Sequence, residues 1–219
     1  MKLENAKINF LGDSITQSVG ASEEAKGYVS LVAQMTGATC RNYGLSGTRI
    51  AKQKFPSPQP HEDLDFCLRA KEMDNDADIV IVFGGTNDFG HGDAPLGEFS
   101  DTTPDTFYGG LHTLCRILIE KFTDSYIIFI TPLHRTEEEV STEPRKLGSS
   151  EPLIKYVNAI REVAEYYSLP IIDLYSNSGI QPNVPIIQEK FMPDGLHPND
   201  EGPKVLAKKI TAFLKNTVI

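Results

Sequence analysis

The segment Asp78-Ile79-Val80-Ile81-Val82-Phe83 gives the clearest indication of the fold. Its β-branched and aromatic side chains follow one another without polar alternation, which is typical of a strand buried on both faces of a parallel sheet. Similar apolar runs cover residues 7–11, 125–130 and 170–174, and a weaker run covers residues 39–43. These five segments are predicted to be strands.

Amphipathic patterns lie between the predicted strands. Apolar residues recur at helical spacing in four ranges, which are 28–35, 106–122, 152–167 and 204–214. Strands that alternate with helices indicate βαβ crossovers, so the predicted fold class is α/β, with a parallel sheet and helices on both of its faces. No internal repeat or break in composition marks a boundary, and residues 1–219 are predicted to form one domain.

The composition excludes several classes of protein and partner. A hydrophobic share of 40% excludes a disordered chain. The chain has 30 acidic against 21 basic side chains, a formal charge of -9 and no basic run, which argues against a nucleic-acid partner. No window approaches the ~20 consecutive apolar residues that a membrane span requires, so no membrane partner is expected. The sequence predicts no particular oligomeric state.

The cysteines and the first residues predict a cellular location. Cys40, Cys67 and Cys115 are odd in number and lack metal-binding spacing, so we expect free, buried thiols. Residues 1–10 contain no apolar stretch long enough for a signal peptide. Together these features predict a cytoplasmic protein.

Three long segments follow predicted strands or their turns, at residues 52–61, 90–105 and 135–151. Each is rich in Pro, Gly, Ser or Thr. In open α/β sheets ligands bind beyond the carboxyl ends of the strands, and long loops there often form the walls of a site. These loops are therefore candidate walls of a site, and surface insertions without function are the alternative.

Ser14 directly follows the first predicted strand, in Leu11-Gly12-Asp13-Ser14-Ile15-Thr16. A Ser at a strand-to-helix turn can lie at a helix N-terminus, where free N–H groups favour developing negative charge. Ser14 is thus a candidate nucleophile, and a plain N-cap is the alternative. The G-x-S-x-G nucleophile elbow is absent from the sequence, as are the Rossmann and P-loop glycine patterns after the first strand.

A candidate acid–base pair lies near the other end of the chain, in Asp194-Gly195-Leu196-His197-Pro198. A His that acts as general base needs an acceptor that fixes its tautomer. An Asp three residues earlier, across a turn that contains Gly, can reach the Nδ1 atom. The alternative is a turn capped by Asp194 beside an exposed loop histidine.

Candidate oxyanion donors follow the second and third predicted strands, in residues 42–47 (NYGLSG) and 85–88 (GTND). A tetrahedral intermediate needs preorganised N–H donors, which a Gly backbone and an Asn side chain can supply. Glycine-rich turns are common after strands, so each segment alone could be purely structural. Their placement at the same sheet edge as Ser14 and His197 is the stronger indication of a site.

In these four blocks the chain resembles the SGNH hydrolases, also called GDSL-type esterases and lipases. Residues 12–15 (GDSI) match the first block, with Ile15 where the family name has Leu. The run that ends in Ser46-Gly47 resembles the second block, residues 85–88 the third and residues 194–198 the last. The order and spacing of the blocks span nearly the whole chain.

The resemblance implies a role for each matching residue. Ser14 would be the nucleophile, His197 the general base and Asp194 the residue that orients His197. The oxyanion hole would consist of the backbone N–H groups of Ser14 and Gly47 and the side-chain amide of Asn87. No cofactor is implied.

The resemblance also implies a fold and a reaction. The fold is a three-layer α/β/α sandwich with a flavodoxin-like sheet of five parallel strands. The reaction is hydrolysis of a small-molecule ester through an acyl-enzyme. Within the second block, Gly44 is the alternative oxyanion donor to Gly47.

No long apolar lid is visible in the sequence, so a short acyl group, acetyl, is predicted. Polar and aromatic loop residues, namely Arg49, Gln59, His91 and Tyr108, suggest a sugar-like alcohol. The alternatives are a lipase or thioesterase of longer acyl chains, a catalytically silent binding module on the same scaffold, and a flavodoxin-like nucleotide binder.

Further side chains are candidates for substrate binding, namely Asp13, Arg49 and His134. Arg49 and Arg135 could bind an anionic substrate group, with solvated arginines as the alternative. A metal site formed by Asp88, His91 and Asp93 is also considered. Their spacing matches no familiar metal-binding pattern, so no metal is predicted.

Overall fold

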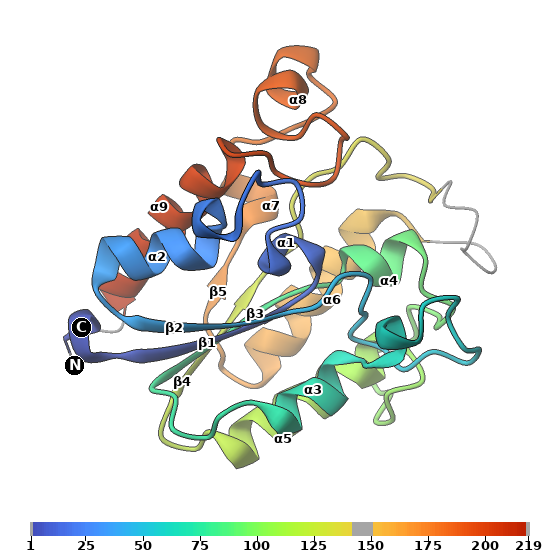
Figure 1. The fold of residues 1–219 in the computed structure, drawn as a ribbon. Coiled ribbons are helices and arrows are strands. Elements are labelled where there is room, and N and C mark those ends of the chain that lie inside the picture. Colours follow the sequence, from blue (N-terminus) through green and yellow to red (C-terminus); the bar gives the residue numbers. More distant parts are fainter. Residues whose placement is uncertain (1, 142–150, 218–219) are drawn as a thin grey trace.

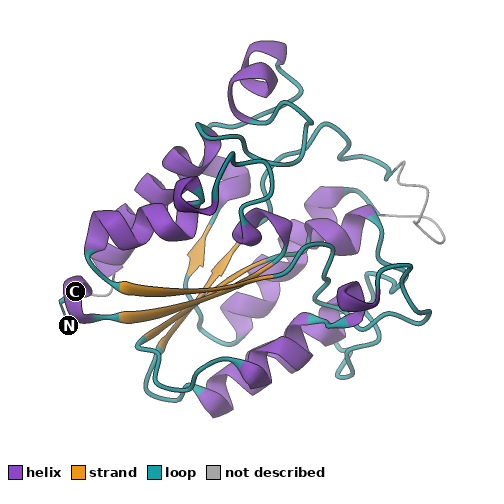
Figure 2. Cartoon of the chain, in the orientation of Figure 1, coloured by secondary structure: helices purple, strands orange, loops and turns teal. Residues whose placement is uncertain are grey.

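The computed structural model describes residues 2–141 and 151–217, whose strands form a wholly parallel sheet (Figures 1 and 2). The five strands are β1 (Lys7–Gly12), β2 (Thr39–Gly44), β3 (Ile79–Phe83), β4 (Tyr126–Ile130) and β5 (Ile171–Ile172). They lie side by side in the order β2-β1-β3-β4-β5. This is the flavodoxin-like order, with the chain reversing direction across the sheet at β1 and β3. The predicted fold class is confirmed.

Helices cover both faces of the sheet (Figure 1). On one face lie α2 (Tyr28–Thr36) and α9 (Gly202–Thr217). On the other face lie α3 (Phe66–Glu72), α5 (Phe107–Lys121) and α6 (Leu153–Tyr166). The shorter helices are α1 (Ser14–Gln17), α4 (Thr86–Gly90), α7 (Leu174–Asn177) and α8 (Pro185–Phe191), and 3-10 turns cover Leu3–Asn5, Glu24–Lys26 and Pro60–Asp63.

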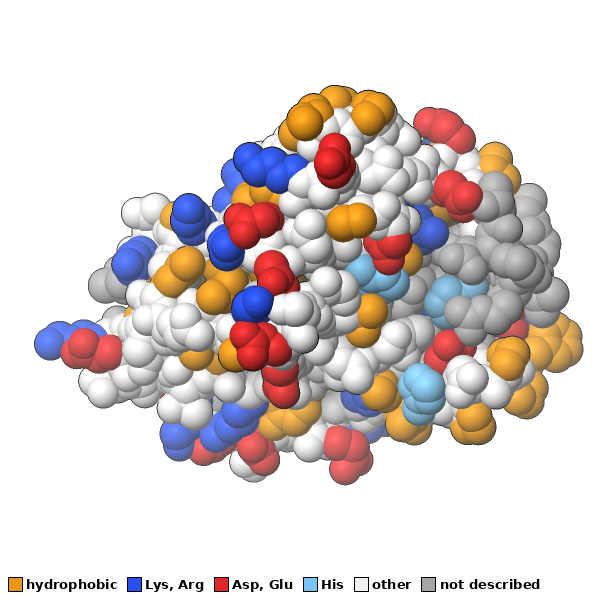
Figure 3. Space-filling model, turned by 45° about the horizontal axis from the view of Figure 1, so that its top comes forward, with side chains coloured by type: hydrophobic (Ala, Val, Ile, Leu, Met, Phe, Trp, Pro, Cys, Tyr) orange, Lys and Arg blue, Asp and Glu red, His pale blue; other side chains and the backbone are white. Residues whose placement is uncertain are grey.

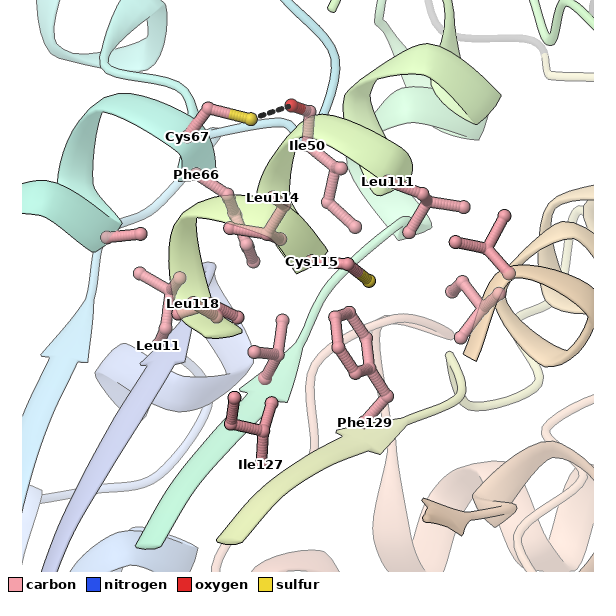
Figure 4. Packing of buried hydrophobic residues seen from close by; sticks show 14 of the residues in the cluster. Leu11, Ile50, Phe66, Cys67, Leu111, Leu114, Cys115, Leu118, Ile127 and Phe129 are labelled. Carbon is pink, nitrogen blue, oxygen red and sulfur yellow. Dashed lines mark hydrogen bonds between the residues drawn. The ribbon is translucent and has the colours of Figure 1, made fainter. Parts of the chain in front are cut away.

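Strand β3 shows why its sequence lacks polar alternation. Ile79 and Ile81 pack into the core beneath α2 and α9. Val80 and Val82 point to the opposite face and join the core beneath α3, α5 and α6, part of which is drawn in Figure 4. Because successive side chains of a strand point to opposite faces, a strand with two covered faces must be apolar at every position.

Two elements have boundaries that differ from the predictions. Strand β5 is shorter than the predicted run 170–174, because the side chain of Asp173 accepts a hydrogen bond from the Ser176 N–H and begins α7. The last helix covers Gly202–Thr217 and is longer at both ends than the predicted range 204–214. Helix α3 was not predicted. Its start is visible in the sequence as an N-cap, since Asp65 accepts a hydrogen bond from the Leu68 N–H.

Helix α8 was not predicted either. It begins with Pro185, a residue that is common in the first turn of a helix. Ile186 is 66% exposed and the preceding Val184 is 45% exposed. Hydrophobic side chains gather accordingly at the top of the molecule, where α8 lies (Figures 1 and 3).

The three cysteines are free, as predicted. Cys67 and Cys115 are buried beneath the outer helices (Figure 4), but Cys40 is only half-buried because it lies on the edge strand β2. Within residues 2–141 and 151–217, no helix has the length and apolarity needed to cross a bilayer.

Candidate active site

Ser14 lies at the carboxyl end of β1, as the first residue of α1. The preceding Asp13 caps this short helix, with its carboxylate accepting a hydrogen bond from the Ile15 N–H at 3.0 Å. Gly12 is required at the turn, because a Cβ atom there would lie 1.8 Å from the Thr16 hydroxyl oxygen. Burial raises the pKa of Asp13 to about 6, against the opposing effect of the Ile15 hydrogen bond.

His197 connects Ser14 to Asp194. Its Nε2 atom lies 3.0 Å from the Ser14 Oγ atom, and its Nδ1 atom lies 2.7 Å from a carboxylate oxygen of Asp194. Gly20 packs against the base of the His197 side chain, because a Cβ on Gly20 would lie 2.9 Å from the Cβ of His197 and 2.7 Å from the Pro198 carbonyl oxygen. Residues from the two ends of the chain therefore form one hydrogen-bonded series, Ser14–His197–Asp194.

The turn around Asp194 holds this carboxylate in place. Its other oxygen accepts hydrogen bonds from the backbone N–H groups of Leu196, at 2.9 Å, and His197, at 2.7 Å. Partial burial alone would raise the pKa of Asp194. The hydrogen bonds from these backbone groups and from the imidazole outweigh burial and lower it. The carboxylate is thus ionised and oriented toward the Nδ1 atom.

Of the two other predicted donors, Gly47 lies in the loop after β2, and Asn87 lies in the short helix α4 that follows β3. Gly47 has a φ angle of +76°, in the left-handed region that favours glycine. The Asn87 amide donates one hydrogen bond to the Thr48 carbonyl at 3.0 Å, which leaves its second N–H for another acceptor. The neighbouring Asp88 carboxylate fixes the same loop by accepting from the backbone N–H groups of residues 50 and 51.

A cavity of about 140 Å³ joins these groups. Its lining residues are Ser14, Ser46, Gly47, Glu62, Asn87, His91, Arg135, Leu196 and His197. Gly44 does not belong to this lining; it ends β2, with its Cα packed on the backbone at Gln17. The structure thus brings together at one sheet edge the four blocks that the sequence singled out.

The model of the GDSL-like Lipase/Acylhydrolase family matches residues 10–205, which include all four blocks. The chain belongs to this family. The resemblance predicted from the sequence is confirmed, and family membership makes the chain a hydrolase of ester bonds.

Solved structures share the fold of this GDSL-family chain. One is 32% identical, with a TM-score of 0.86 and 99% of each chain covered. A protein from Lactobacillus plantarum is 28% identical, with a TM-score of 0.82 and coverage of 98% of this chain and 99% of its own. The lipase/acylhydrolase from Enterococcus faecalis is 24% identical, with a TM-score of 0.66 and 96% of each chain covered. The comparison with curated proteins finds no match.

Two further charged residues, Glu62 and Arg135, line the cavity of this GDSL-family hydrolase. Arg135 was considered from the sequence as a residue that binds an anionic group, whereas Glu62 was not among the predicted site residues. Arg135 follows β4 and is only 5% exposed, so it is not a solvated arginine. Its guanidinium lies over the Phe89 ring at 5.2 Å and donates to the Thr86 carbonyl at 3.3 Å. Its position just after a strand is a signal in the sequence. Glu62 lies in a 3-10 turn between β2 and α3, where no sequence pattern indicates a site.

The three predicted substrate-binding residues lie in different places. Asp13 lies behind Ser14 and is not part of the cavity lining. Arg49 lies next to the cavity and is described below. His134 is outside the lining: its Nδ1 atom is 2.8 Å from a Glu138 oxygen, and its ring lies 3.9 Å from the Tyr175 ring. Substrate binding by these residues stays a prediction.

A second cavity of about 210 Å³ adjoins the first, and Glu62 and His91 line both. Its other lining residues are Arg49, Gln53, Phe55, Pro56, Ser57, Pro58 and Asp93. The segment 52–61, predicted as a candidate wall, therefore supplies much of this cavity, and the segment 90–105 supplies His91 and Asp93. Part of the third segment, 142–150, lies outside the described residues.

Asp88 and Asp93, the acidic residues of the possible metal site, accept hydrogen bonds from backbone N–H groups. Asp88 holds the loop after β2, and the Asp93 carboxylate accepts hydrogen bonds from the Lys54 and Phe55 N–H groups. His91 lies beside Arg49, with 3.0 Å between the Nδ1 atom and the guanidinium. Within the part of the chain that the structure describes, no three His, Cys, Asp or Glu side chains are grouped as metal ligands would be.

Proposed function

We propose that this chain is a serine esterase that hydrolyses short-chain esters, acetyl esters in the first place, of a hydroxyl-rich alcohol such as a carbohydrate. The observation that carries the proposal is the Ser14–His197–Asp194 series, with 3.0 Å between Oγ and Nε2 and 2.7 Å between Nδ1 and the carboxylate. A hydroxyl, an imidazole and a carboxylate joined in this way can form and hydrolyse an acyl-enzyme.

In the first half of the reaction, the Ser14 Oγ attacks the ester carbonyl carbon while its proton passes to the His197 Nε2. Asp194 stabilises the imidazolium that results. The carbonyl oxygen becomes an oxyanion, which accepts hydrogen bonds from the N–H groups of Ser14 and Gly47 and from the Asn87 amide. The carbon–oxygen bond to the alcohol then breaks, and the alcohol leaves with the proton from Nε2.

In the second half, a water molecule attacks the acyl group on Ser14 and passes a proton to the His197 Nε2. A second tetrahedral intermediate forms at the same donors. Its collapse breaks the bond to the Ser14 Oγ, which regains the proton from Nε2, and releases the carboxylic acid. The side chains end the cycle in their starting protonation states.

The size and polarity of the site support a short acyl group. The cavity at Ser14 holds about 140 Å³, and its lining includes the charged side chains of Glu62 and Arg135. A long alkyl chain there would displace water from this charged lining and offer no hydrogen bond in return, which is unfavourable. The methyl group of an acetyl ester requires no such contact with the charged side chains.

Hydrolysis of 4-nitrophenyl acetate, butyrate and octanoate by wild type and Ser14→Ala tests the proposal. We expect saturable activity that is highest on acetate and falls at least 1000-fold in Ser14→Ala, the order of loss typical when a nucleophile is removed. Labelling by a serine-directed phosphonate is expected in wild type only. Octanoate preference would favour a long-chain lipase or thioesterase, and a wild type that hydrolyses none of the esters and stays unlabelled would favour a silent binding module.

A further inference from the structure

Glu62 occupies a position between the proposed oxyanion hole and the second cavity. Its side chain is 7% exposed and lines both cavities. It packs directly on Gly47, because a Cβ added to Gly47 would lie 2.6 Å from the Cγ and the Oε1 of Glu62. A substrate that extends from Ser14 into the second cavity would therefore lie beside Glu62 and His91, which line both cavities.

Arg49 is one of the partners of the Glu62 carboxylate and balances its charge. The closest approach of the guanidinium to the Glu62 carboxylate is 3.7 Å, which is longer than a hydrogen bond. The guanidinium donates at shorter range to the Ser57 hydroxyl, at 2.6 Å, and to the Glu62 backbone carbonyl, at 3.2 Å. A carboxylate offers about four acceptor positions, so Glu62 can accept hydrogen bonds from a ligand beside its protein contacts.

The second cavity combines apolar and polar walls. Phe55, Pro56 and Pro58 supply apolar surface, and the Phe55 side chain is 62% exposed. Gln53 and Glu62 supply polar atoms on the other side. A ring with C–H groups on its faces and hydroxyls around its edge satisfies both kinds of wall.

We propose that Glu62 determines the specificity for the alcohol part of the ester, by accepting a hydrogen bond from a hydroxyl of a neutral, sugar-like ring that packs on Phe55. The inference rests on the proposed function, since an acetyl ester has only a methyl group on its acyl side. Whatever reaches the second cavity must then belong to the alcohol. The lining of the second cavity has two carboxylates, those of Glu62 and Asp93, against one guanidinium, that of Arg49, so an acidic alcohol is disfavoured.

The test compares two acetyl esters that differ in the alcohol, a monoacetylated methyl glycoside and 4-nitrophenyl acetate. The quantity measured is the ratio of their kcat/KM values. If a substitution at Glu62 disturbs Gly47 and with it the oxyanion hole, kcat/KM falls equally for the two esters and their ratio is unchanged. Loss of a hydroxyl contact lowers the glycoside value selectively.

We expect Glu62→Gln to lower the ratio about ten- to hundredfold, the usual effect of one charged hydrogen bond. Phe55→Ala, a change at an exposed ring, should lower it severalfold. Glu165→Gln removes the same charge from an exposed position on α6, away from both cavities, and should leave the ratio as in wild type.

An unchanged ratio in both Glu62→Gln and Phe55→Ala would overturn this inference alone. A wild-type preference for acetylcholine over the glycoside would also overturn it, in favour of a cationic alcohol. If Ser14→Ala hydrolyses both esters as fast as wild type, the proposed function fails and this inference with it. The two failures are therefore distinguishable.

Discussion

Replacement of Asn87 by Ala tests the proposed oxyanion hole and separates catalysis from stability. Loss of one oxyanion donor typically lowers kcat about 10²–10³-fold, equivalent to about 2.7–4 kcal/mol of transition-state stabilisation. The same change removes the 3.0 Å hydrogen bond to the Thr48 carbonyl. A buried carbonyl that is left without a hydrogen-bond donor costs about 1–3 kcal/mol, so the free energy of unfolding should fall by about 2 kcal/mol.

Asn9→Ala is the matched control. Asn9 is buried in β1, and its amide also donates to a backbone carbonyl, that of Asp74, at 2.7 Å. It lies three residues before Gly12, the last residue of β1, which is about 10 Å along the strand. We expect a similar loss of stability in urea unfolding and a kcat close to that of wild type.

Steady-state kinetics on 4-nitrophenyl acetate at 25 °C distinguish the possibilities. In Asn87→Ala, kcat and kcat/KM should fall together, because the bond forms only in the transition state. The assignment of Asn87 would be refuted by a kcat within threefold of wild type, by an effect confined to KM, or by an equal loss of kcat in Asn9→Ala.

Three further changes test the site and its surroundings. Asp194→Asn should lower kcat about 10⁴-fold, because an amide no longer stabilises the His197 imidazolium; a loss below tenfold would contradict the proposed role. Gly47→Ala should lower both Tm and kcat/KM, since φ is +76° and the new Cβ would lie 2.6 Å from the Glu62 side chain; unchanged thermal melting would contradict this. Burial raises the pKa of Asp13 from 3.8 to about 6, so the folded state binds the extra proton between these pH values. Stability therefore falls by about 3 kcal/mol as the pH rises through this window, and Asp13→Asn should abolish that part of the pH dependence in urea unfolding; equal slopes in the two proteins would contradict it.

Most of the sheet could be predicted because burial on two faces leaves a direct trace in the sequence. Every position of β3 is apolar, and β4 is apolar after Tyr126. Strand β1 is less uniform, with Lys7 and Asn9 among its six residues. Strand β5 was predicted too long because Ile171, Ile172 and Leu174 are all apolar, while only the capping bond of Asp173 divides strand from helix. Helix α3 was missed because seven residues offer too few turns for a clear period.

The proposed triad and the donors could be predicted because each lies in a short block that follows a strand or a tight turn. Glu62 could not, since its position beside Gly47 depends on how the segment 52–65 folds back across the sheet edge. Its neighbour Arg49 looks like any surface arginine in the sequence, yet it is 2% exposed. Long-range packing of this kind leaves no periodic signal in a single sequence.

The contact between Ser14 and His197 joins residues 183 positions apart. Closure of so large a loop is entropically costly and has little local structure to guide it. In refolding experiments, far-ultraviolet circular dichroism should therefore recover before the enzyme turns over substrate, because sheet and helices can form while the last segment is still undocked. The time course of recovered turnover would then report when the C-terminal segment docks on the rest of the fold.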